Sequence, residues 1–96
     1  MNDKEMLIAA AQAAGIEVVT PTMLEYGKWN PLEDDGDALR LAVKLRLEIL
    51  NDGYMVVVRT GMLSNKAWQT PLWEDECEST RRAIVRAAAE IGKAMQ

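Results

Sequence analysis

Residues 29–45 read WNPLEDDGDALRLAVKL, and this stretch decides the fold. A proline, a glycine and four acids in five positions lead into a dense apolar run with helical spacing. Acids stabilise the start of a helix because aligned peptide dipoles give that end a partial positive charge. The stretch therefore predicts a helix over 33–45 with Asp34 or Asp35 as its cap. Its wide apolar arc, Leu39 included, predicts that this helix is buried against a sheet.

The residues that follow predict a β-hairpin. Apolar and polar residues alternate over 47–51, and Asn51-Asp52-Gly53 then forms a strong turn signal, because Gly tolerates the positive φ that tight hairpin turns require. The return strand over 54–59 contains four successive apolar residues, as expected of a central strand covered by helices on both faces. A third strand is expected near 66–70.

Two further helices are expected near the ends of the chain. Strong helix formers fill 3–14, and Gly15 follows as a stop signal. Near the other end, acids over 74–78 precede a helix with Ser79 or Thr80 as candidate cap. Its apolar stripe is Ala83, Ile84, Ala87, Ala88, Ile91 and Met95.

Together these elements predict a single α+β domain over 1–96. A short strand or irregular hairpin is expected over 16–29, between the first two helices. The whole chain then has three helices packed on a small antiparallel sheet of three or four strands. The arrangement is an α/β/α or two-layer sandwich.

The composition excludes several kinds of chemistry. The chain has no histidine, so it can form neither a Ser-His-Asp triad nor an imidazole metal site. Its single cysteine, Cys77, allows no internal disulfide and suits a reducing compartment. No apolar run is long enough for a membrane span. We therefore expect a cytoplasmic protein that is not an enzyme, needs no cofactor and does not bind membranes.

Three tryptophans and two acids form a candidate interface. Trp29, Trp68 and Trp73 each lie near proline or lysine in loop-like sequence, and Asp34 and Asp35 add an acidic rim. The indoles either close gaps at the sheet edges, which is the simpler interpretation, or anchor a protein partner at low entropic cost. The leading hypothesis is a protein–protein interaction module. A homodimer is a further option, because short edge strands favour self-association.

The sequence also suggests two other functions. Arg81, Arg82 and Arg86 give the last helix a basic face that could contact nucleic acid, but the net charge of −4 and the acids upstream oppose phosphate binding. The acidic segment 33–37 could hold a metal ion and support a carboxylate- or metal-dependent activity. Its spacing excludes an EF-hand loop, however, and helix capping explains the acids more simply.

Two segments carry a family resemblance: WNPLEDDGDALRLAVKL over 29–45 and TRRAIVRAAAEIGKAM over 80–95. They resemble a family of small phage and prophage proteins of proteobacteria with an ABA-sandwich (α/β/α) domain. The resemblance implies a layered fold and a phage-derived accessory protein in the cytosol of a bacterial host. The family has no established activity, so the resemblance implies no catalytic residues.

Overall fold

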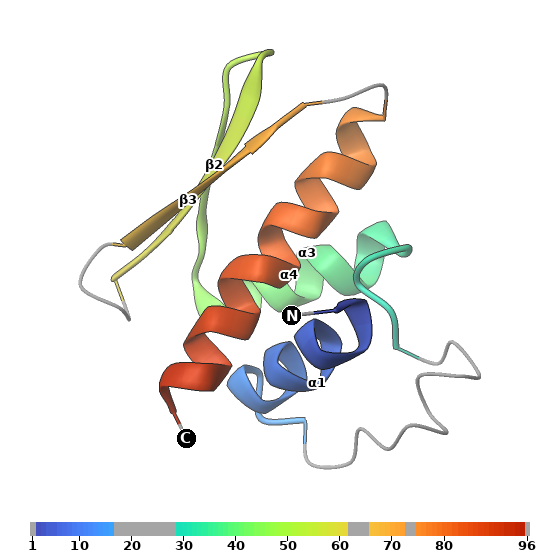
Figure 1. Cartoon of the computed structure of the whole chain (residues 1–96), viewed down its shortest axis with the longest axis vertical. Coiled ribbons are helices and arrows are strands. Elements are labelled where there is room, and N and C mark those ends of the chain that lie inside the picture. Colours follow the sequence, from blue (N-terminus) through green and yellow to red (C-terminus); the bar gives the residue numbers. More distant parts are fainter. Residues whose placement is uncertain (1, 17–28, 62–65, 73–74, 96) are drawn as a thin grey trace.

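The structure is a computed structural model that describes residues 2–16, 29–61, 66–72 and 75–95 (Figure 1). Within these residues, three helices and a three-stranded antiparallel sheet form an α+β fold, which confirms the predicted fold class. The expected strand region over 16–29 falls almost wholly outside the described residues. In chain order the elements are α1 (Asp3–Ala13), α3 (Asp35–Leu45), β1 (Glu48–Asn51), β2 (Met55–Thr60), β3 (Lys66–Pro71) and α4 (Glu76–Ala94).

The hairpin between β1 and β2 forms where the turn signal predicts it. Gly53 has a φ of 89°, in the region where a side chain would be strained. Its backbone N–H donates to Asn51 Oδ1 at 2.8 Å. Asp52 Oδ1 accepts the backbone N–H groups of Tyr54 and Met55 at 2.9 and 3.0 Å. The Met55 and Tyr54 hydrogen bonds lower the pKa of Asp52, because they favour the charged carboxylate.

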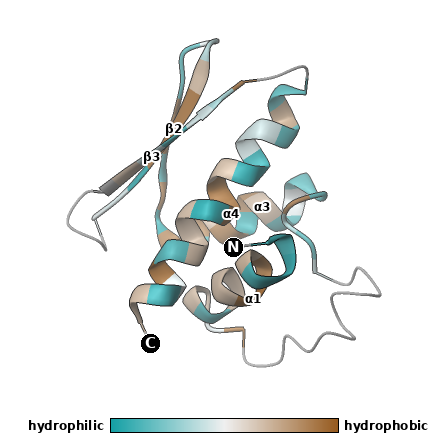
Figure 2. Cartoon of the chain, in the orientation of Figure 1, coloured by the Kyte–Doolittle hydropathy of each residue, from teal (hydrophilic) through white to brown (hydrophobic). Residues whose placement is uncertain are grey.

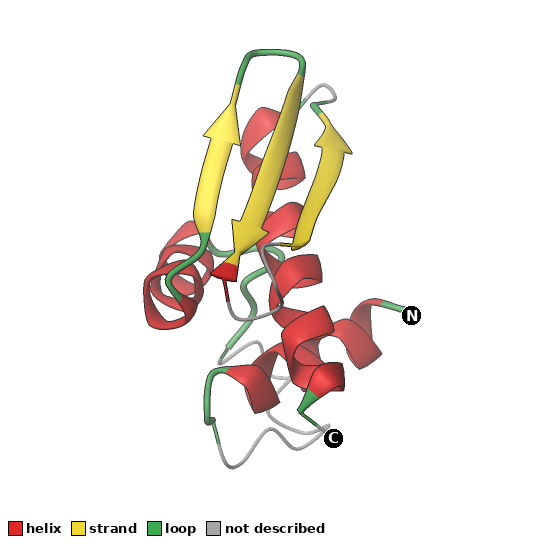
Figure 3. Ribbon diagram, turned by 90° about the vertical axis from the view of Figure 1, so that its left-hand side faces the viewer, coloured by secondary structure: helices red, strands yellow, loops and turns green. Residues whose placement is uncertain are grey.

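The sheet has the strand order β1-β2-β3, so β2 is the central strand, as predicted. Helix α4 covers one face, where Val56 and Val58 are fully buried (Figure 3). The expectation of helices on both faces is not met among the described residues, because α1 and α3 pack on α4 instead of on the second face. Met55 and Val57, which alternate with the buried valines, are accordingly only half-buried.

Helix α4 is the central element of the core, and it contacts both other helices and the sheet. Figure 2 shows hydrophobic residues along its middle and hydrophilic ones toward its first turn. Two details of the predicted helix are wrong. Asp75, not Ser79 or Thr80, is the cap, and its Oδ1 accepts the backbone N–H of Glu78 at 2.9 Å. Met95 is 63% exposed, because it follows the last turn that the other elements cover.

Helix α3 is capped as its sequence predicts. Asp34 Oδ2 accepts the backbone N–H of Asp37 at 2.7 Å, and the helix begins at Asp35. Its core-facing stripe packs on α4, and not on a sheet as expected. The residues of this stripe are Ala38, Leu41, Ala42 and Leu45.

The expected burial of Leu39 is wrong, and Val43 one turn further on is likewise exposed. Their exposed fractions are 63% and 68%. Each follows a residue of the buried stripe, and one residue in an α-helix turns the side chain by about 100°. Leu39 and Val43 therefore form a second apolar stripe, beside the buried one, that α4 leaves uncovered.

The Asp75 cap gives a first testable prediction. Replacing Asp75 with Ala should lower the free energy of unfolding by about 1 kcal/mol, because the N–H of Glu78 loses its acceptor. Asp75→Asn retains an acceptor oxygen, so its free energy of unfolding should fall clearly less. Urea unfolding followed by circular dichroism measures both. Equal losses in the two variants would show that the negative charge, and not the capping oxygen, matters.

Candidate functional site

A groove of about 320 Å³ lies between the start of α3, β1 and the first turns of α4. We call it the α3–β1 groove. Ile84 at its base is only 5% exposed, whereas Leu39 and Ile49 beside it are 63% and 37% exposed. The groove therefore joins a buried apolar floor to apolar side chains that water still reaches. Its lining is Asp35, Ala38, Leu39, Ile49, Asn51, Glu76, Cys77, Thr80, Arg81 and Ile84.

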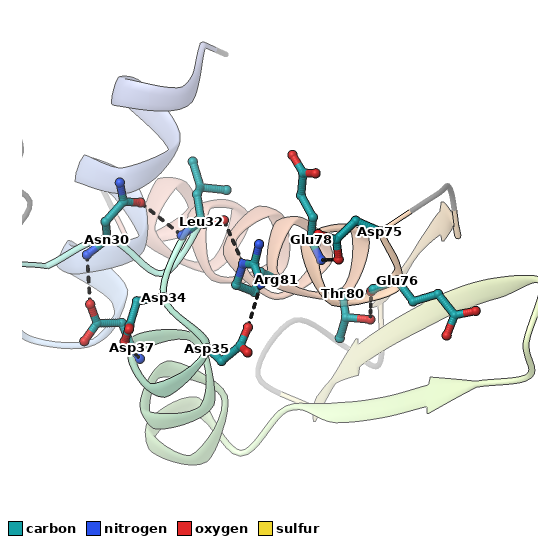
Figure 4. A network of polar contacts seen from close by, with 10 residues as sticks. All are labelled: Asn30, Leu32, Asp34, Asp35, Asp37, Asp75, Glu76, Glu78, Thr80 and Arg81. Atoms are coloured by element: carbon teal, nitrogen blue, oxygen red, sulfur yellow. Dashed lines mark hydrogen bonds and ion pairs between the residues drawn. The ribbon is translucent and has the colours of Figure 1, made fainter.

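Arg81 holds the two helices that border the groove together. Its Nε donates to the carbonyl oxygen of Leu32 at 2.9 Å, and its Nη1 donates to Asp35 Oδ1 at 2.6 Å (Figure 4). The hydrogen bond that Arg81 donates to Asp35 raises the pKa of Arg81, because it favours the charged guanidinium. The charges of Arg81 and Asp35 thus largely offset each other. Glu76, exposed on the same rim, adds negative charge.

The basic face of α4 serves mainly to hold the fold together. Arg82 donates to the two carboxylate oxygens of Asp3 at 3.0 and 3.2 Å and so links α4 to α1. This contact lowers the pKa of Asp3 and raises that of Arg82. Arg81 is paired with Asp35, and only Arg86 of the three candidate residues is fully on the exposed side. Two of the three cations proposed for nucleic acid therefore already face a carboxylate.

Three acids of segment 33–37, Asp34, Asp35 and Asp37, are engaged within the fold, and Asp34 and Asp37 share Arg40. Asp34 caps α3, and Asp35 pairs with Arg81. Asp37 accepts the backbone N–H of Asn30 at 2.9 Å and pairs with Arg40 at 2.7 Å. Within the described part of the chain, no three side chains of metal-binding type come together. The geometry offers the metal hypothesis no ligand cluster.

The two described tryptophans of the candidate interface, Trp29 and Trp68, do not line the groove. Trp29 and Trp68 are half-buried and pack against the hydrophobic core. Trp68 is opposite Val58 in the sheet, so its ring is on the face that α4 covers. Trp73 lies outside the described residues. Of the predicted interface residues that the structure describes, only Asp35 lines the groove.

The sequence reasoning missed Leu39 and Ile49 as surface residues. One signal was available for Leu39: the apolar residues of 38–45 span two helical stripes, and one stripe is enough to fill a helix–helix contact. No comparable signal existed for Ile49, because its exposure depends on β1 lying at an edge of the sheet.

Comparison with known proteins adds no relative: no family model, curated protein or solved structure matches the chain. Among the described helices, none has the length and hydrophobicity needed to cross a lipid bilayer.

The Asp3–Arg82 pair predicts a pH dependence. The pKa of Asp3 is lower in the folded chain than in the unfolded chain, so its carboxylate stabilises the fold above its ordinary pKa of 3.8. That contribution is lost as the pH falls below this value toward the folded-state pKa. Asp3→Asn should therefore flatten the fall in melting temperature between about pH 5 and about pH 2.

Arg82→Gln provides the control for this pair. In an Arg82→Gln background, adding Asp3→Asn should leave the acid dependence unchanged, because the favourable partner is already absent. Thermal melts of the four proteins across the pH range measure the effect. An equally steep acid loss in wild type and Asp3→Asn would contradict the assignment.

Proposed function

We propose that this chain is a protein-interaction module that binds a partner in the α3–β1 groove and does not catalyse a reaction. The observation that carries the proposal is the exposure of Leu39 and Ile49 beside the buried Ile84. An apolar surface that continues from an open rim to a buried floor is typical of binding sites.

A partner that covers this surface gains a substantial binding free energy. Full burial of a leucine or isoleucine side chain contributes about 1.5–3 kcal/mol. Since Leu39 is 63% and Ile49 is 37% exposed, a partner that covers both gains roughly 1.5–3 kcal/mol from these two side chains. Side chains in a concave, desolvated position are also where binding energy usually concentrates. The groove is therefore large enough and apolar enough to anchor one or two side chains of a partner.

The polar groups of the rim favour binding over catalysis. Arg81 and Asp35 neutralise each other, and the Thr80 hydroxyl donates to the carbonyl of Glu76 at 2.8 Å. Groups already engaged within the fold serve better to shape a surface than to transfer protons.

The resemblance to phage and prophage proteins extends the proposal. It suggests an accessory protein whose partner is present in the cytosol of a bacterium that carries the phage. The neighbouring genes provide an independent test of the phage origin. Genes of a phage module are expected on both sides of the coding sequence.

A matched pair of variants tests the groove. Leu39→Glu places a charge in the groove, whereas Val43→Glu places the same charge on the same helix at a residue of similar exposure outside it. Peptides selected on the wild-type protein from a displayed library of random twelve-residue sequences should bind Val43→Glu normally. They should bind Leu39→Glu at least about tenfold more weakly, a loss of about 1.4 kcal/mol.

Two results would contradict the proposal. The first is a set of selected peptides that bind Leu39→Glu as tightly as wild type. The second is a selection that yields no peptide with specific affinity. Circular dichroism of both variants confirms beforehand that they fold, as expected for substitutions at exposed helix residues.

A further inference from the structure

Strand β1 presents an unpaired edge beside the groove. In the described part of the chain it lies at the end of the sheet and pairs with β2 alone. The backbone N–H of Asp52 donates to the Met55 carbonyl at 3.3 Å, so the backbone of Asp52 faces the return strand of the hairpin. Backbone groups alternate in direction along an antiparallel strand. Leu50 therefore turns its N–H and C=O toward β2, and Ile49 and Asn51 turn theirs outward.

The two residues with outward backbone groups are also the two β1 residues that line the groove. Ile49 is opposite Val58 and Asn51 is opposite Val56. Because both valines are buried under α4, the side chains of Ile49 and Asn51 lie on the α4 side of the sheet. A chain paired with the outer edge of β1 would thus place alternate side chains over the groove.

The two edges of the sheet differ in their residue types. Strand β3 ends with Pro71, and proline is a residue that protects an edge against pairing because it has no backbone N–H to donate. Strand β1 carries Ile49 and Leu50, which are 37% and 47% exposed. The β1 edge is therefore the one suited to accept a further strand.

The charge around the groove selects the kind of partner. Asp35 and Glu76 lie on the rim, and Asp75 and Glu78 are exposed near it at the start of α4. Among the described residues that line the groove, Arg81 is the one base, and it is already paired with Asp35. A second copy of this chain, with a net charge of −4, would bring like charge to the site. A segment with lysine or arginine is complementary to it.

We propose that the outer edge of β1 binds an extended segment of a partner protein by strand addition. The segment alternates apolar side chains, which enter the α3–β1 groove, with lysine or arginine side chains, which face the acidic rim. This inference rests on the proposed function and specifies the conformation and charge of the partner.

Backbone methylation gives a direct test. The strongest peptide from the selection is synthesised in two forms, N-methylated at its odd-numbered or at its even-numbered residues. In strand addition only one of these sets donates to β1, so one form should bind at least about tenfold more weakly and the other nearly as well as the parent. Amide hydrogen exchange should slow at Ile49 and Asn51 when the parent peptide binds.

Each alternative outcome contradicts a different part of the proposal. Equal binding by the two methylated forms would refute strand addition, while a Leu39-dependent affinity would leave the groove itself in place. Selected peptides rich in Asp or Glu would refute the basic partner. A dimer of the protein alone in sedimentation that Leu39→Glu dissociates would assign the groove to a second copy. If no selected peptide bound Leu39→Glu more weakly than wild type, the proposed function would be refuted as well.

Discussion

Replacing Gly92 with Ala is expected to destabilise this fold strongly. A Cβ at Gly92 would overlap the carbonyl oxygen of Ala9 and would lie 2.8 Å from the carbonyl carbon of that residue. Both atoms belong to the backbone of α1, so they cannot rotate aside as a flexible side chain would. The two helices would have to separate along their whole contact, which is part of the main core.

The cost of this clash can be estimated. Overpacking of a close contact typically costs 1–3 kcal/mol, and a rigid backbone neighbour places Gly92→Ala at about 3 kcal/mol or more. This loss would exceed the gain of about 1 kcal/mol that alanine normally brings to a helix interior. For a domain of this size the melting temperature should fall by roughly 12–24 °C.

Gly36→Ala is the matched control, because it makes the same change in the first turn of α3. There the added methyl group would lie 3.2 Å from Asp34 Oδ2 and 3.3 Å from the Arg40 guanidinium. Both side chains are exposed and can move, so the free energy of unfolding should change by less than about 0.5 kcal/mol. Thermal melts of the two variants measure the contrast. Equal stability of Gly92→Ala and wild type would contradict the close packing of α1 on α4.

Truncation of Ile91 should have the second-largest effect. Ile91 is 1% exposed and is among the largest fully buried side chains. Ile91→Ala removes three heavy-atom groups from a filled core, and such changes cost 2–5 kcal/mol because a cavity remains, so we expect about 3 kcal/mol. Ile91→Val removes one methyl group and should cost about 1 kcal/mol.

Met95→Ala is the control for this series. Met95 lies one turn beyond Ile91 but is 63% exposed, so the substitution should cost less than about 0.5 kcal/mol. Chemical denaturation of the three variants gives the free energies directly. The apolar stripe in the sequence predicts similar burial for both residues. Comparable losses of unfolding free energy in Ile91→Ala and Met95→Ala would therefore contradict the exposure of Met95 in the structure.

The local elements could be predicted from the sequence because their signals are local. The Asp34 cap, the Asn51-Asp52-Gly53 turn and the third strand near 66–70 each depend on a few neighbouring residues, and each forms in the structure. The central place of β2 followed from its run of apolar residues. The cap of α4 was misplaced, because several capping residues stand in succession there and only the geometry selects Asp75.

The candidate site was harder to predict. The tryptophans drew attention because large indoles often anchor partners, yet Trp29 and Trp68 pack against the core. The groove instead gathers Leu39, Ile49 and Ile84 from three elements that are far apart in the chain. No local pattern states which apolar residues an adjacent element will leave uncovered.

The sequence by itself determined the class of fold, the start of helix α3, the turn of the hairpin and the exclusion of histidine-based chemistry. Helix propensity, capping and turn formation depend on a few neighbouring residues, so they can be predicted from the sequence alone. Only the tertiary structure decided that α3 packs on α4, that Leu39 stays exposed and that β1 is an edge beside a groove. Those features arise because a helix or strand buries only the surface that its neighbours cover, and the neighbours are chosen by the packing of the whole chain.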